Sequence, residues 1–189
     1  MNNEIYFITG NKEKLMILSN IAQSKGIKII QKKIECPEIQ HEDIEEVAKF
    51  SAKWAANKLG KPVIKNDCGL MIDALNGFPG FSAKFAEKWL KAEGFLKLMQ
   101  GETNRQMKYV DVTAYCEPFK EPIVFRSETL GRMSHKKSGN YGWELDYIFI
   151  VDGDDKTMAH YPDNERIKLL NSQHYHELLE YLKHHPQTI

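Results

Sequence analysis

The amino-terminal part of the sequence alternates between β-prone and helix-prone segments, and this alternation constrains the fold more than any other feature. Residues 4–8 are β-prone, Thr9-Gly10-Asn11 interrupts them, and apolar residues then recur at helical spacing as far as Ala22. A second β-prone stretch covers residues 27–35, another helical stripe starts at Ile44, and a short strand is predicted over 62–64. Such alternation predicts a sheet covered by helices.

The middle and the end of the chain add further elements. Asn76-Gly77-Phe78-Pro79-Gly80 predicts a turn, and the apolar stripe beyond it predicts a helix in which Phe85 and Trp89 are interpreted as core residues. Residues 110–116 and 123–130 predict a β-hairpin, 147–151 a last strand, and the stripe from Ile167 to Tyr181 a final helix. The prediction is an α/β fold with a mixed sheet flanked by helices, in one domain over residues 1–189.

The composition excludes several classes of partner. Lys and Arg total 26 against 26 Asp and Glu, so a broad basic surface for nucleic acid or an anionic membrane is not expected. The three cysteines cannot all pair within the chain, and no apolar run is long enough to span a bilayer. These observations predict a cytoplasmic protein without membrane or nucleic-acid partners.

The junction after the first strand is a candidate anion site. Gly10 lets backbone N–H groups approach a ligand at a helix N-terminus, and Lys14 adds a positive charge in the first turn. The alternative is an ordinary helix cap. Lys49 and Lys53 lie one turn apart on the next helix, where either could contact phosphate or belong to a solvated face.

Two acidic residues are candidates for Mg²⁺ chemistry. Glu38 follows Pro37, and Asp67 follows the short strand. Mg²⁺ takes oxygen ligands, and a carboxylate can also act as general base towards water, so Asp67 fits either role. The alternative is that Asp67 caps the turn before Gly69 while Glu38 is merely exposed.

Several segments, in this order, resemble the inosine triphosphate pyrophosphatase family, which removes non-standard purine nucleotides. They are Thr9-Gly10-Asn11-x-x-Lys14, Pro37-Glu38, Asp67-Cys68-Gly69-Leu70, Pro79-Gly80-Phe81-Ser82-Ala83-Lys84, and Tyr141-Gly142-Trp143 with Asp146-Tyr147-Ile148-Phe149.

The resemblance implies an elongated, two-lobed fold with a long central mixed sheet, a site in the cleft between the lobes, a Mg²⁺ requirement and a homodimer. Glu38 and Asp67 would then hold the metal, and Asp67 and Lys14 would be catalytic. The implied substrate-binding residues are Thr9, Asn11, Lys14, Lys53, Ser82, Tyr141, Trp143, Asp146, Lys168, Ser172, Gln173 and His174.

The chain departs from the family pattern at five places, one of which is His160, where the family commonly has an acid. Asn66 replaces the first of two adjacent acids, Glu144-Leu145 is an insertion, and Tyr147 replaces a proline. The family's Ser-His-Arg is Ser172-Gln173-His174 here, which removes a planar guanidinium that reads the purine. These changes affect the predicted metal affinity and base preference, and His174 also lies on an apolar stripe, as a core histidine would.

The leading hypothesis is a Mg²⁺-dependent hydrolase that converts ITP, dITP, XTP or a related nucleoside triphosphate into the monophosphate and pyrophosphate. The alternative, favoured by Asn66 and Ser172-Gln173-His174, is a nucleotide-binding protein of the same fold with weakened catalysis.

Overall fold

The computed structural model describes residues 4–37 and 39–185. Within them, seven strands form one mixed sheet in the order β2-β1-β3-β5-β6-β7, with β4 on β3. β1 is parallel to β2 and β3, whereas β4 is antiparallel to β3 and β7 to β6. The strands are β1 Glu4–Ile8, β2 Lys28–Lys32, β3 Val63–Ile72, β4 Pro79–Gly80, β5 Gln106–Cys116, β6 Ile123–Met133 and β7 Phe149–Val151. The predicted mixed sheet is confirmed.

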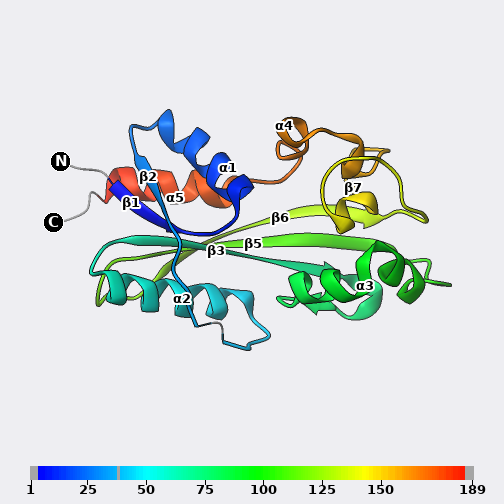
Figure 1. Ribbon diagram of the computed structural model, residues 1–189, viewed down its shortest axis with the longest axis horizontal. Coiled ribbons are helices and arrows are strands. Elements are labelled where there is room, and N and C mark those ends of the chain that lie inside the picture. The colour runs from blue at the N-terminus through cyan, green and yellow to red at the C-terminus, as the bar shows by residue number, and fades with distance from the viewer. Residues whose placement is uncertain (1–3, 38, 186–189) are drawn as a thin grey trace. The chain divides into compact units, whose positions relative to one another are not determined.

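Helices surround the sheet, as Figure 1 shows. They are α1 Lys12–Gln23, α2 Ile44–Leu59, α3 Ala83–Leu98, α4 Asp163–Arg166 and α5 Gln173–His184, with short 3-10 helices η1 Asp73–Leu75, η2 Glu144–Tyr147 and η3 Met158–His160. Among the described residues, no helix is both long and apolar enough to cross a membrane.

The chain divides into two compact units. The first holds the chain up to Asp67, Asp111–Ser127 and the chain from Ser172, and the second holds Cys68–Val110 and Glu128–Asn171. In the first unit, α1 and α5 pack on one face of the strands and α2 covers the other (Figure 1). Ala48, Ala52 and Ala56 of α2 are fully buried, because small side chains let the helix approach the sheet closely.

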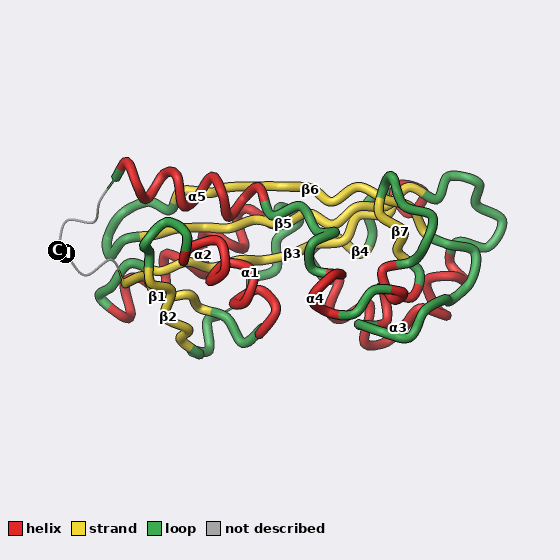
Figure 2. The backbone as a smooth tube through the Cα atoms, turned by 90° about the horizontal axis from the view of Figure 1, so that it is seen from above, coloured by secondary structure: helices red, strands yellow, loops and turns green. Residues whose placement is uncertain are grey.

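In the second unit, α3 packs against the strands through Ala92 and Phe95, both fully buried (Figure 2). The helix breaks at Lys91, whose φ of 52° is non-helical. The interpretation of Phe85 and Trp89 as core residues is wrong, since they are 54% and 74% exposed. The buried side of the first half of α3 carries the small Ala86 instead, so the rings of Phe85 and Trp89 lie on the exposed side.

Two predicted boundaries are also wrong. The strand expected over 62–64 continues to Ile72, because Asn66 and Asp67 stay in extended backbone rather than forming a turn. The last helix starts at Gln173 rather than near Ile167, since α4 ends at Arg166 and the chain between them is not helical.

Candidate functional site

The carboxyl end of β1 is a topological switch point. β1 lies between the parallel strands β2 and β3, so the chain leaves β1 towards one neighbour and returns on the other side. Ligands of open α/β sheets bind outside the carboxyl ends of the strands at such a point. Thr9-Gly10-Asn11 follows β1 there, and the predicted Asp67 lies on β3.

Asn11 is the N-cap of α1. Its Oδ1 accepts hydrogen bonds from Glu13 N at 2.8 Å and Lys14 N at 3.2 Å, while Asn11 N donates to Thr9 Oγ1 at 3.0 Å. A Cβ on Gly10 would meet nothing within 4 Å, so the backbone here faces open space. The helix cap is therefore present, with two first-turn N–H groups already bonded to Asn11, and the anion-binding role of this helix start stays a prediction.

Lys14 links this helix start to the acidic segment. Its Nζ donates to the backbone oxygen of Asn66 at 3.2 Å, next to Asp67. Asp67 is half-buried, and its Oδ2 is shielded from solvent. The structure thus brings Lys14 into the immediate vicinity of Asp67, whereas the third predicted residue, Glu38, lies outside the described residues.

A hollow of about 400 Å³ opens beside Thr9 and Gly10, and its lining includes Lys33, Glu35 and Lys65. Sequence reasoning did not select the two lysines. Lys65 could have been selected from the sequence. Side chains alternate along a strand, so Lys65 and Asp67 lie on the same face of β3. The hollow beside Gly10 therefore carries two lysines and one glutamate.

Asn66 points to the opposite face of β3 and is only 6% exposed. Its Nδ2 donates to the backbone oxygen of Val112 at 3.2 Å and to Thr113 Oγ1 at 3.0 Å. The bond to Val112 requires a donor, which an ionised carboxylate lacks. The amide at this position is therefore part of the sheet packing.

Replacing Asn66 by aspartate is expected to destabilise the protein without improving metal use. A buried carboxylate facing a carbonyl oxygen should lower the free energy of unfolding by about 3 kcal/mol, the cost typical of an uncompensated buried charge. Urea unfolding and Mg²⁺ titration of activity measure both effects. A variant of unchanged stability that needs less Mg²⁺ would contradict this assignment, and Asn57→Asp on the surface of α2 is the control.

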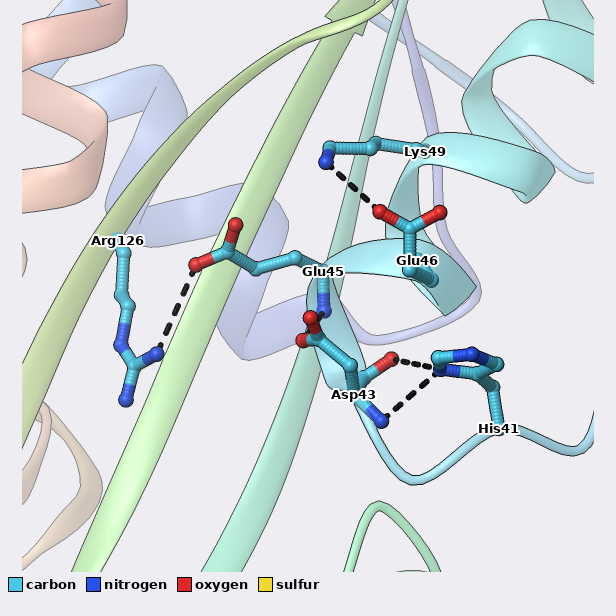
Figure 3. Close-up of polar contacts among 6 residues, drawn as sticks. All are labelled: His41, Asp43, Glu45, Glu46, Lys49 and Arg126. Atoms are coloured by element: carbon cyan, nitrogen blue, oxygen red, sulfur yellow. Dashed lines mark hydrogen bonds and ion pairs between the residues drawn. The ribbon is translucent and has the colours of Figure 1, made fainter.

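The two candidate lysines of α2, Lys49 and Lys53, are paired with carboxylates. Lys49 Nζ contacts Glu46 Oε1 at 2.8 Å, and this hydrogen bond raises the pKa of Lys49 (Figure 3). Lys53 forms an ion pair with Glu121. These pairs are exposed and each ammonium group has three donors, so the predicted phosphate contact of Lys53 stays a prediction.

Figure 3 also shows how the start of α2 is fixed. Asp43 Oδ1 accepts from Glu45 N at 2.8 Å and caps the helix, and Asp43 N donates to His41 Nδ1 at 3.0 Å. Glu45 lies 3.6 Å from Arg126 on β6. These contacts attach the helix start to the sheet.

The predicted base-reading residues at the start of α5 belong to the first unit. Ser172 is the N-cap, and the exposed Gln173 donates to Glu177 Oε1 at 3.1 Å. His174 is 3% exposed, with its Nδ1 2.5 Å from Ser127 Oγ. The alternative of a core histidine fits this position better than a contact with a base.

The remaining predicted residues belong to the second unit. Tyr141 and Trp143 are 49% and 63% exposed, as rings available for stacking would be. Ser82 precedes α3 and is half-buried, and Lys168 is exposed. Asp146 is buried in an ion pair with Arg166, a residue that the sequence pattern did not single out.

The inserted residues Glu144 and Leu145 attach η2 to α3. Leu145 is buried in the core, and Glu144 Oε2 accepts from Ala92 N at 3.3 Å, where the break in α3 leaves that group without its helical partner. On the same side, hydrogen bonds from the backbone of Leu145 and Glu144 reach Glu87. The inserted residues therefore stabilise the packing of η2 against α3.

Glu87 predicts a pH dependence of stability. Burial raises its pKa above the ordinary 4.5, and the charges of Asp146 and Glu144 act in the same direction. An acid whose pKa is raised by folding contributes stability below its unfolded pKa, and loses that contribution as the pH rises through the folded value. The unfolding temperature of the wild type, relative to Glu87→Gln, is expected to fall from pH 4 to pH 7. Parallel curves for the two proteins would contradict this.

Comparisons with known proteins found related sequences and a related solved structure. The sequence model of the Ham1 family matches residues 5–174. A dITP/XTP pyrophosphatase of Methanopyrus kandleri is 38% identical over 166 residues, 88% of each chain. An inosine triphosphate pyrophosphatase of Puccinia graminis f. sp. tritici is 33% identical over 190 residues, 96% of each chain. A solved structure of the Ham1 protein of Staphylococcus aureus aligns with a TM-score of 0.80 and 27% identity, covering 97% of this chain and 100% of that one.

Proposed function

The chain belongs to the Ham1 family, and from this premise we propose that it hydrolyses dITP, ITP and XTP to the nucleoside monophosphate and pyrophosphate. Family membership confirms the resemblance seen in the sequence, and the relatives named above carry these activities in their names. The enzyme is thus a nucleoside triphosphate pyrophosphatase that acts on non-canonical purine nucleotides.

The observation that carries the proposal is the contact of Lys14 Nζ with the backbone oxygen of Asn66. It brings the helix N-terminus after β1 to the segment that contains Asp67. A polyphosphate needs a cationic cradle, and hydrolysis needs a group that activates water beside it. Both requirements are met by residues of the first unit.

In this proposal, the N-terminus of α1, Lys14, Lys33 and Lys65 bind the phosphate chain. Lys14 offsets negative charge that develops on the leaving pyrophosphate. Asp67 either accepts the proton of the attacking water or holds a metal ion. Stacking on the base is assigned to Tyr141 and Trp143, whose rings are exposed.

Mg²⁺ fits the donor set that this proposal uses. Among the described residues, no group of three or more His, Cys, Asp or Glu side chains is arranged around a metal position. Mg²⁺ does not need such a group, because it is commonly held by one or two carboxylates together with substrate phosphates and water. Asp67 and, by the family resemblance, Glu38 would supply those carboxylates. Bound there, the ion would neutralise phosphate charge.

A panel of nucleoside triphosphates tests the function. Purified protein with Mg²⁺ is incubated with ITP, dITP, XTP and the standard triphosphates, and monophosphate, pyrophosphate and orthophosphate are measured separately. Preferred release of monophosphate and pyrophosphate from ITP, dITP or XTP is expected. Orthophosphate as first product would refute the proposed bond, and calorimetric binding without hydrolysis would favour the nucleotide-binding alternative.

A homodimer is part of the same proposal. The exposed rings of Phe85 and Trp89 form a tilted pair with centroids 6.0 Å apart, an apolar surface that a second copy would cover. Light scattering should give twice the chain mass of 21.9 kDa, and a monomer at micromolar concentration would contradict it.

A further inference from the structure

A buried ion pair lies beneath the loop Tyr141–Asp146, called here the aromatic loop. Arg166 of α4 is 2% exposed, and its Nη1 donates to Asp146 Oδ2. The same oxygen accepts from the backbone N–H of Trp143 at 2.7 Å. Asp146 Oδ2 thus links the guanidinium of Arg166 to the backbone of Trp143, whose indole ring is exposed.

Gly142 brings the backbone of the loop directly onto this pair. It has a φ of +82°, and a Cβ built there would lie 1.9 Å from Arg166 Nη1 and 2.1 Å from Asp146 Oδ2. The preceding part of the loop is held as well, because Asn140 N and Tyr141 N both donate to the backbone oxygen of Ala159, at 2.7 and 3.0 Å. The backbone is therefore anchored while the rings of Tyr141 and Trp143 face solvent.

We propose that Arg166 is a positioning residue for substrate recognition, which holds the aromatic loop through Asp146 so that Tyr141 and Trp143 are preformed to stack on the nucleotide base. This inference rests on the proposed function. Arg166 is too deeply buried to touch the base, so it acts through the loop.

The fork of the guanidinium is required for this role. Nη1 bonds to the buried Asp146, and Nη2 bonds to Asp163 Oδ1 at 3.0 Å. Lysine would keep the charge but lacks the rigid, planar N–H geometry with which Nη1 meets the buried Asp146. The two acids differ in their surroundings, because the side chain of Asp163 is 69% exposed and that of Asp146 only 10%. Asp163 therefore provides a matched control for Asp146.

Loosening the loop should weaken binding rather than the chemical step. If the stacking-competent loop were populated only about one-tenth of the time, the apparent affinity would fall about tenfold. Arg166→Lys is therefore expected to raise the KM for ITP about tenfold while kcat changes less than about twofold. Asp163→Asn should leave both constants close to the wild-type values, because a solvated ion pair contributes little.

Gly142→Ala tests the same contact with Arg166 and Asp146 intact, and Gly142 itself is exposed. Its Cβ would push the loop off the ion pair, so the same rise in KM is expected. An unchanged KM in either folded variant, or a fall in kcat at constant KM, would overturn the proposal. If Arg166→Lys does not fold, Gly142→Ala decides.

Fluorescence separates this inference from the proposed function. Trp54→Phe and Trp89→Phe leave Trp143 as the one tryptophan of three. Acrylamide quenching of Trp143 without nucleotide should increase in Arg166→Lys and Gly142→Ala, and not in Asp163→Asn. If the wild type hydrolyses no triphosphate, the proposed function fails while this measurement still decides whether Arg166 orders the loop. Equal quenching in all variants would refute the positioning role.

Discussion

Replacing Asp67 by asparagine is expected to lower kcat for ITP by at least about 10³-fold, within the range that a positioned proton acceptor contributes. The substitution keeps the shape of the side chain but removes the charge needed either to accept the proton of water or to hold Mg²⁺. Because Asp67 is only half-buried, the free energy of unfolding should change by less than about 1 kcal/mol. Pyrophosphate release and urea unfolding measure the two effects.

The residual activity of this variant can separate the two roles left open for Asp67. A lost metal ligand should raise the Mg²⁺ concentration needed for half-maximal activity, whereas a lost general base should leave that concentration unchanged and remove the acidic limb of the pH profile. Asp73→Asn at an exposed site is the matched control and should retain full activity. Undiminished pyrophosphate release from Asp67→Asn would exclude both roles.

Replacing Lys14 by methionine is expected to reduce kcat by about 10²–10³-fold, the usual effect of removing one group that stabilises transition-state charge. The hydrogen bond from Lys14 Nζ goes to the backbone oxygen of Asn66, which is neutral. This contact therefore does not neutralise the positive charge of Lys14. Methionine keeps the apolar stem and the helix propensity, so α1 should form normally.

Lys12→Met provides the comparison for this variant. Lys12 lies in the same first turn of α1 but is exposed, whereas Lys14 is half-buried against β3. Steady-state kinetics of the two variants therefore distinguish a specific phosphate contact from a general effect of positive charge at the helix start. Equal losses in both variants, or none in Lys14→Met, would contradict the specific role.

The ion pair of Asp146 with Arg166 could not be predicted from the sequence. Its place in a family motif predicted a contact with the base, yet the motif did not indicate that Arg166 neutralises it. The two residues are twenty positions apart, and nothing in their local patterns links them. The sequence also left two positions open for His174, a base contact or a place in the core on its apolar stripe. The structure shows that its buried ring is hydrogen-bonded to Ser127 Oγ.

The sequence by itself determined the family, the mixed α/β class and the approximate positions of most elements. Helical spacing, strand alternation and turn residues are local properties, and motif order is preserved along the chain, so both can be interpreted without coordinates. The candidate phosphate segment at Thr9-Gly10-Asn11 and the candidate acid Asp67 were identified on that basis.

Only the tertiary structure decided which of these residues meet. The strand order places β1 beside β3, and this brings Lys14 to Asn66 and adds Lys65 to the hollow beside Gly10. The packing of α3 through Ala86, Ala92 and Phe95 likewise decided that Phe85 and Trp89 are exposed. Contacts between distant residues depend on strand order and helix packing, which periodicity does not encode, because many arrangements bury the same apolar stripes equally well.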